Sequence, residues 1–124
     1  PPGLHLACGG WKKLPASQKP WLRSALASVG ILPRLVPGEF VYLSKNAVIL
    51  LGGVGAAFDA GRELNHGPVA VQVKNVQEAE FAVERGAGVI MVDTGCLVDL
   101  EEVHARLLEL GCREHLSLAF GGGV

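Results

Sequence analysis

The sequence of 124 residues lacks an excess of charge, a long apolar run and any paired cysteine framework. The formal net charge is -1, which argues against a nucleic-acid partner held mainly by attraction to phosphates. No apolar run reaches the roughly 18 residues that a membrane span needs, and no charged-then-apolar leader opens the chain. These absences predict a cytoplasmic protein with no nucleic-acid partner and no membrane partner.

Residues that commonly hold metals or perform nucleophilic catalysis are also few. Cys8, Cys96 and Cys112 are an odd number of cysteines without metal-like spacing, so we expect free thiols in a reducing compartment. The four histidines show no ligand spacing either. Hydrophobic residues make up 49% of the chain and charged residues 19%, a globular rather than a disordered composition. A chain of this length buries one modest core, and we expect a single domain over residues 1–124.

The clearest pattern is a strand–helix–strand unit over residues 68–93. Alternating valines over residues 69–73 have the two-residue period of a strand. Asn75 and Glu78 then resemble a capping box at the start of a helix. The apolar run 89–92 has no polar alternation, which is typical of a strand buried on both faces, and it ends at Asp93. Two parallel strands joined through a helix predict a right-handed βαβ unit.

Weaker patterns flank this unit on both sides. Residues 39–44 and 116–120 predict strands, and residues 53–64 predict a helix with Leu64 facing inward. Asp99 and Glu102 predict the capped start of a long helix that buries Leu110. Residues 1–37 are irregular apart from a short helix at 21–29. The alternation predicts an α/β fold with a mainly parallel sheet, and residues 38–124 form its βα units. A closed eight-stranded barrel needs roughly 200 residues, so we expect a partial, open β/α barrel.

Candidate site residues follow the predicted strands, where ligand loops lie in βα folds. Lys45 follows the first strand, Asp93 ends a buried one, and Gly121, Gly122 and Gly123 follow the last. Consecutive glycine N–H groups could cradle a phosphate, although a flexible turn has the same sequence. Asp93 could bind hydroxyls or a metal, or it could cap the next turn, and an isolated Lys45 could be a solvated side chain. The residues themselves predict a phosphorylated ligand at the strand ends.

Several stretches together are similar to one family. They are P-R-L at residues 33–35, L-S-K-N-A-V-I-L-L-G-G-V-G-A-A-F at 43–58, V-I-M-V-D at 89–93 and A-F-G-G-G-V at 119–124. The chain resembles the C-terminal α/β-barrel domain of quinolinate phosphoribosyltransferase, the carboxylating nicotinate-nucleotide pyrophosphorylase. The resemblance begins at a Pro-Gly-Leu at residues 2–4 and covers most of the chain, apart from an apparent insertion at about residues 7–31.

The resemblance implies a reaction of NAD biosynthesis. Members of the family use Mg²⁺ and transfer a phosphoribosyl group from phosphoribosyl pyrophosphate to quinolinate, a pyridine dicarboxylate. The products are nicotinate mononucleotide, CO₂ and pyrophosphate. By position, the resemblance implies catalytic roles for Lys45 and Asp93, with Asp93 holding ribose hydroxyls or the metal. It implies substrate binding by Arg34, Ser44 and Gln72, with Arg34 on a quinolinate carboxylate, and phosphate binding by the glycine triple at residues 121–123.

The chain also departs from the family at charged positions. Ser44 stands where the family has a reactive-site lysine, and Ala70, Gln72 and Ala119 replace glutamates. Removing such charges lowers transition-state stabilisation, so the transfer activity is expected to be impaired. One alternative is a non-catalytic relative, a binding or assembly subunit or a molybdenum-transport paralogue that retains a phosphate site. Another is an unrelated barrel fragment that binds a different sugar phosphate. Unpaired edge strands predict a homo-oligomer.

Overall fold

The computed structural model describes residues 3–10 and 13–123. The chain divides into two compact units, Pro1–Pro37 and Gly38–Val124, which are described separately. The start of the predicted Pro-Gly-Leu motif at Pro2 and the last residue of the phosphate motif, Val124, lie outside the described residues. The expectation of a single domain over residues 1–124 stays a prediction.

The N-terminal unit contains the 3₁₀ helix η2 (Ala16–Gln18) and the helix α1 (Lys19–Ser28). Pro20 lies in the first turn of α1, where the missing N–H costs nothing because no intrahelical partner exists there. Ala7 and Leu32 form an isolated parallel bridge. Leu26 is the buried residue of α1, so this unit holds little core of its own among its described residues.

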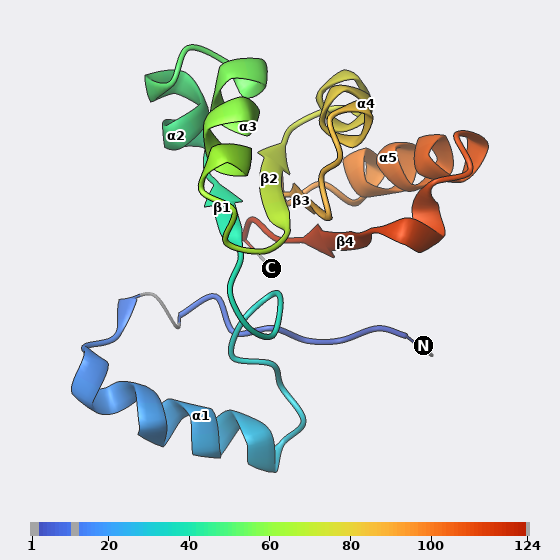
Figure 1. Cartoon of the computed structure of the whole chain (residues 1–124). Coiled ribbons are helices and arrows are strands. Elements are labelled where there is room, and N and C mark those ends of the chain that lie inside the picture. The colour runs from blue at the N-terminus through green and yellow to red at the C-terminus, as the bar shows by residue number, and fades with distance from the viewer. Residues whose placement is uncertain (1–2, 11–12, 124) are drawn as a thin grey trace. The chain divides into compact units, whose positions relative to one another are not determined.

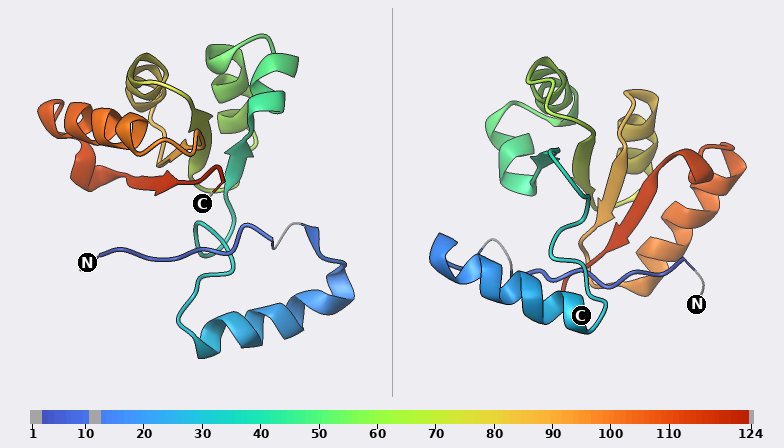
Figure 2. Two further views of the ribbon diagram at one scale, coloured as in Figure 1. Left: turned by 180° about the vertical axis from the view of Figure 1, so that it is seen from behind. Right: turned by 60° about the horizontal axis from the view of Figure 1, so that its bottom comes forward.

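The C-terminal unit is built on a four-stranded sheet in the order β1-β2-β3-β4 (Figure 1). Its strands are β1 (Val41–Leu43), β2 (Val69–Val73), β3 (Val89–Val92) and β4 (Ser117–Phe120). Each pairs in parallel with its neighbour, and Figure 2 shows the strands side by side in chain order. The predicted α/β fold with an open parallel sheet is therefore confirmed, and the sheet is parallel throughout.

Helices α3 (Val54–Glu63), α4 (Val76–Glu84) and α5 (Leu97–Glu109) alternate with these strands, and the 3₁₀ helix η3 (Arg113–His115) precedes β4. The three α-helices pack on one face of the sheet and form a single apolar cluster with it. The helices contribute Ala57, Phe58, Ala79, Ala82, Val103 and Leu107. The strands contribute Leu43, Val69, Val71, Val73, Ile90 and Val92. The register explains this, because Leu43, Val71 and Ile90 are lateral neighbours and point to the same side.

The capping prediction for α4 is confirmed. The Asn75 side chain accepts a hydrogen bond of 2.8 Å from the Glu78 amide, and the Glu78 carboxylate accepts one of 2.9 Å from the Lys74 amide. The predicted start of the last helix at Asp99 is wrong, because α5 begins at Leu97 with Cys96 in the N-cap position. Asp99 instead lies in the first turn, where a carboxylate interacts favourably with the helix dipole.

Two predicted core residues are also wrong. Leu64 and Leu110 are 58% and 45% exposed. Each occupies the C-cap position of its helix, α3 or α5, one residue beyond the last residue of that helix. The prediction extended the helical period of each helix by one residue, to the C-cap, and for that reason it placed both side chains in the core. No helix among the described residues has the length and apolarity to cross a bilayer.

A short helix, α2 (Lys45–Leu50), was not predicted from the sequence. Ser44 is its N-cap and accepts a hydrogen bond of 3.3 Å from the Ala47 amide. Six residues are too few to show a helical apolar period, and the apolar tip at residues 49–51 is exposed. The predicted strand over residues 39–44 is correspondingly shorter, because its last residue caps α2.

Candidate functional site

The face of the sheet opposite α3–α5, termed the open face, carries the polar strand residues. Gln72 lies beside Met91, and Met91 lies beside Ala119, so one row of side chains crosses β2, β3 and β4 on this face. Asp93 follows Met91 by two residues and extends the same side of β3. The candidate site is the carboxyl edge of the sheet, termed the mouth, and it comprises Ser44, Lys45, Gln72, Asp93, Gly121, Gly122 and Gly123.

Gln72 connects two elements of the mouth through its carboxamide. Its Nε2 donates a hydrogen bond of 2.8 Å to Oδ2 of Asp93, and its Oε1 accepts one of 3.2 Å from the Lys45 amide. The orientation of the amide follows from its partners, since a carboxylate only accepts and a backbone N–H only donates. Gln72 therefore links the first turn of α2 to the acid that ends β3.

Asp93 and the glycine triple lie at the same edge of the sheet. The Gly121 amide donates a hydrogen bond of 2.9 Å to the Val92 carbonyl, which brings the end of β4 beside the end of β3. A Cβ on Gly121 would lie 3.1 Å from Oδ1 of Asp93 and 2.7 Å from Cε of Met91. The carboxylate thus has one oxygen bonded to Gln72 and the other beside Gly121.

The glycine triple also has a packing role. The Gly121 carbonyl accepts a hydrogen bond of 2.9 Å from the Gly95 amide, in the loop after β3. Gly122 has a φ of 94°, and a Cβ on it would lie 2.6 Å from the Gly95 nitrogen, so only glycine fits there. Because the Gly121 N–H is bonded to Val92, it is not available to a phosphate in this conformation. Within residues 3–10 and 13–123, the N–H groups of Gly122 and Gly123 have no backbone acceptor.

Tyr42 is a residue of the open face that the sequence reasoning did not select. It lies on β1 beside Ala70 of β2. Burial raises the pKa of its phenol above the usual 10.0, and the negative charge of Asp93 raises that pKa further. Asp93 therefore belongs to the electrostatic surroundings of the phenol. The alternation in residues 39–44 could have indicated which face it occupies, but not its proximity to Asp93.

The remaining predicted site residues fall in different places. Ser44 and Lys45 lie at the carboxyl end of β1, where Ser44 uses its hydroxyl to cap α2 and Lys45 is exposed. Arg34 is an exposed residue of the N-terminal unit, so its predicted contact with a substrate carboxylate stays a prediction. The roles assigned to the other residues by resemblance also stay predictions, although the fold brings the strand-end positions to one edge.

The residues of the mouth do not fit a resident magnesium ion. Asp93 is the carboxylate that the strand ends supply, and Gln72 already occupies one of its oxygens. The described part of the chain contains no group of three or more His, Cys, Asp or Glu side chains that could hold a metal. Mg²⁺ favours octahedral oxygen coordination and is commonly held by one or two carboxylates together with substrate phosphates. This donor set does not suit a resident ion, and the predicted role of Asp93 as a metal ligand stays a prediction.

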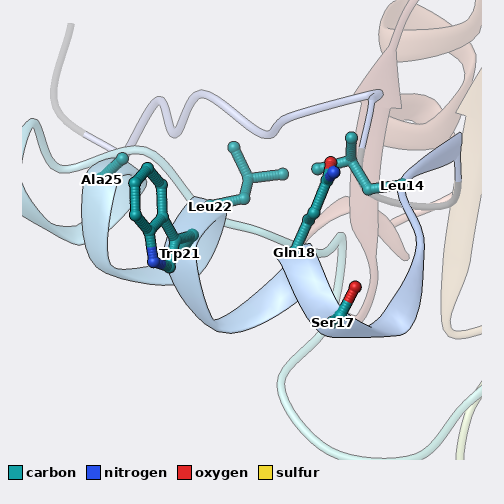
Figure 3. Close-up of a pocket in the computed structure, with 6 residues that line it drawn as sticks. All are labelled: Leu14, Ser17, Gln18, Trp21, Leu22 and Ala25. Atoms are coloured by element: carbon teal, nitrogen blue, oxygen red, sulfur yellow. The ribbon is translucent and has the colours of Figure 1, made fainter.

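A concave surface lies in the N-terminal unit, along η2 and α1 (Figure 3). It is an open hollow of about 570 Å³. Its six lining residues include two polar side chains and no charged one; they are Leu14, Ser17, Gln18, Trp21, Leu22 and Ala25. A phosphate would find no cation among these residues, so the mouth remains the candidate site for the predicted ligand.

The fold and the site together define an open βα sheet with its polar residues at the strand carboxyl ends, the arrangement of part of a β/α barrel. Solved structures of NadC, the quinolinate phosphoribosyltransferase, have this fold. NadC from Streptococcus pyogenes matches with a TM-score of 0.74 at 18% identity, over 98% of this chain and 41% of that one. Two NadC deletion mutants, in a cubic and a C222₁ crystal form, match with TM-scores of 0.72 and 0.75 at 20% and 16% identity.

The likeness is one of fold. The chain covers 40% and 49% of the two deletion-mutant chains, so it spans less than half the length of these NadC structures. No protein-family model and no curated protein matches the sequence. The resemblance found in the motifs is thus supported by the three-dimensional structure, which matches part of the NadC barrel.

Proposed function

We propose that the mouth binds a phosphorylated ribose and that the chain takes part in phosphoribosyl transfer of the quinolinate phosphoribosyltransferase type. One observation carries this proposal: an acid and a glycine loop meet at the carboxyl edge of a parallel sheet that matches part of NadC. Ligands of parallel βα folds bind at that edge. An unrelated sugar-phosphate barrel would share the edge but would not be expected to share the family motifs.

Each group of the mouth has a chemical role in this proposal. The N–H groups of Gly122 and Gly123 donate to the 5′-phosphate of the ribose. Oδ1 of Asp93, beside Gly121, accepts a hydrogen bond from a ribose hydroxyl, while Gln72 holds Oδ2. Lys45, at the start of α2, supplies a positive charge for the diphosphate that leaves. A magnesium ion would be held by that diphosphate and would offset its negative charge.

The proposed reaction joins the phosphoribosyl group of phosphoribosyl pyrophosphate to the nitrogen of quinolinate. Pyrophosphate leaves, and loss of CO₂ gives nicotinate mononucleotide. Ala70, Gln72 and Ala119 stand where the resemblance has carboxylates, and they cannot stabilise positive charge on the ribose in the transition state. The loss of one such preorganised group typically lowers the rate about 100- to 1,000-fold. We therefore expect slow transfer at most.

Isothermal titration calorimetry with phosphoribosyl pyrophosphate tests the binding part of the proposal. Asp93→Ala and Gly122→Val are expected to abolish the binding heat that the parent chain shows. Glu101→Ala, which removes an exposed carboxylate from α5, and Gly111→Val, at a positive φ of 71° in open space, are the matched controls. If the parent chain binds phosphoribosyl pyrophosphate and Asp93→Ala and Gly122→Val bind it equally well, the mouth is not the binding site.

A non-catalytic relative is the second candidate. The neutral amide of Gln72 beside Asp93 favours it, because this site orients an acid without adding a second charge. The two candidates are separated by measuring the formation of nicotinate mononucleotide. The measurement is made with this chain and with a longer version that carries a family N-terminal domain. Turnover in either supports the transferase. Binding without turnover in both supports the non-catalytic relative.

Among the described residues, the outer edges of β1 and β4 have no neighbouring strand, and we propose a homo-oligomer on this ground. Edge strands expose backbone N–H and C=O groups that pair readily with another chain. Light scattering after size-exclusion chromatography checks this, with a mass at least twice the 13.0 kDa of one chain as the expected result. A monomer at all concentrations would contradict it.

A further inference from the structure

We propose that Gln72 is a positioning residue that occupies one oxygen of Asp93 and makes ligand binding at the mouth independent of divalent cations. The observation is a single carboxamide that bonds to both the acid and the Lys45 amide, at 2.8 Å and 3.2 Å. The part of this inference that concerns a ribose phosphate rests on the proposed function. The part that concerns the metal does not.

A cation at this edge would meet a carboxylate that already has a hydrogen-bond partner. Asp93 is exposed, so a cation could approach it, but its Oδ2 already accepts from Gln72 Nε2. A cation that used both carboxylate oxygens would have to displace the Gln72 amide, and a cation on Oδ1 alone would have one protein ligand. The Gln72 Oε1 is directed to the Lys45 N–H and does not offer a second ligand without breaking that bond.

Gln72 also determines the negative charge beside Asp93. A glutamate at position 72 would place two carboxylates within hydrogen-bond distance, where both cannot stay ionised unless a proton or a cation lies between them. The glutamine removes this need because its Nε2 supplies a donor in the same place. The mouth therefore keeps its acid oriented by hydrogen bonding alone, which is the task that a bridging cation would otherwise perform.

The other carboxylate oxygen of Asp93 faces the glycine loop. Oδ1 of Asp93 lies beside Gly121, and the N–H groups of Gly122 and Gly123 follow directly along the chain. Gln72 thus leaves one acceptor oxygen directed toward the loop with the donor groups. A sugar phosphate fits this pair of features through hydroxyl and phosphate contacts, without a metal between protein and ligand.

Mn²⁺ binding tests the part of the inference that concerns the metal. It is measured as the loss of the electron paramagnetic resonance signal of hydrated Mn²⁺. The parent chain is expected to show no saturable binding in the micromolar range. Gln72→Glu is expected to gain at least about tenfold in affinity, because it adds a second carboxylate. Gln72→Met, of similar size and without charge, frees Oδ2 of Asp93 without adding a second carboxylate, so it should gain less than Gln72→Glu, and adding Asp93→Asn to Gln72→Glu should remove the gain. Equal Mn²⁺ affinity in the parent chain, Gln72→Glu and Gln72→Met would overturn the inference.

Ribose 5-phosphate tests the ligand part, because it lacks the diphosphate that carries magnesium. Its dissociation constant for the parent chain is expected to change less than about twofold between buffers with EDTA and with Mg²⁺. A tenfold tightening by Mg²⁺ would overturn the inference. If no ribose 5-phosphate binds in either buffer, the proposed function fails while the manganese result still decides the role of Gln72. Circular dichroism establishes that each variant remains folded.

Discussion

The two faces of the sheet differ in what they bury and in what their residues do. The face toward α3–α5 is lined by fully buried apolar residues such as Val71, Ile90 and Val92. The open face carries Tyr42 and Gln72, and Asp93 extends it at the mouth, where its side chain accepts a hydrogen bond from that of Gln72. The comparison indicates that burial against the helices provides most of the stability of the C-terminal unit. The open face is then able to carry polar groups.

The largest expected effect comes from a matched pair of leucines on α5. Leu107 is 1% exposed, whereas its neighbour Leu108 is 55% exposed. Leu107→Ala is expected to lower the free energy of unfolding by about 2–5 kcal/mol, because it leaves a cavity in the core. Leu108→Ala should change it by less than about 0.5 kcal/mol. Urea denaturation of both variants measures the difference, and equal losses would show that the helix-covered face is not the main source of stability.

A smaller effect is expected in the glycine loop at the mouth. Gly122 and Gly123 both have a positive φ, but only a Cβ on Gly122 meets backbone atoms of the neighbouring loop. Gly123→Ala should cost about 1 kcal/mol of stability through the left-handed conformation alone. Gly122→Ala should cost more, since the loop after β3 must also move. Chemical denaturation of the two variants compares them, and a larger loss for Gly123→Ala would contradict the close packing of the two loops.

The smallest effect concerns the phenol of Tyr42. Asp93→Asn removes the charge that contributes to its raised pKa, but burial, the larger cause, remains. The pKa of Tyr42 should therefore fall toward 10.0 without reaching it. Tyr42 is the sole tyrosine of the chain, so tyrosinate absorbance at alkaline pH reports it directly. An unchanged titration in Asp93→Asn would show that the phenol does not feel the acid.

The same raised pKa gives the sign of a pH effect on stability. The unfolded chain releases the phenol proton near 10.0, while the folded chain holds it to higher pH. The stability contributed by Tyr42 is therefore complete below about pH 10 and is lost as the pH rises through the folded pKa. Tyr42→Phe, which has no proton to lose, should remove this part of the alkaline loss in denaturation experiments.

The sequence was most informative where a strand or helix was long enough to show its characteristic apolar period, or where a capping residue marked its start. The alternation at residues 69–73 and the cap at Asn75 predicted β2 and the start of α4. The six-residue helix α2 gave no period, and the cap of α5 lies at Cys96, a residue type that gives no capping signal. The predicted strand ends were sufficient to place Asp93 and the glycine loop at one edge of the sheet. The hydrogen bonds of Gln72 and the bonded amide of Gly121 depend on register between strands, which one sequence does not contain.

The proposed site for a phosphorylated ribose is the carboxyl ends of the strands rather than another part of the chain. Its most direct test is a titration of the ¹⁵N-labelled chain with ribose 5-phosphate, followed through the backbone amide signals. We expect progressive shifts at Lys45, Asp93, Gly122 and Gly123, with the signals of η2 and α1 unchanged. Shifts confined to the hollow beside Trp21, or no shifts at the mouth at saturating ligand, would contradict it.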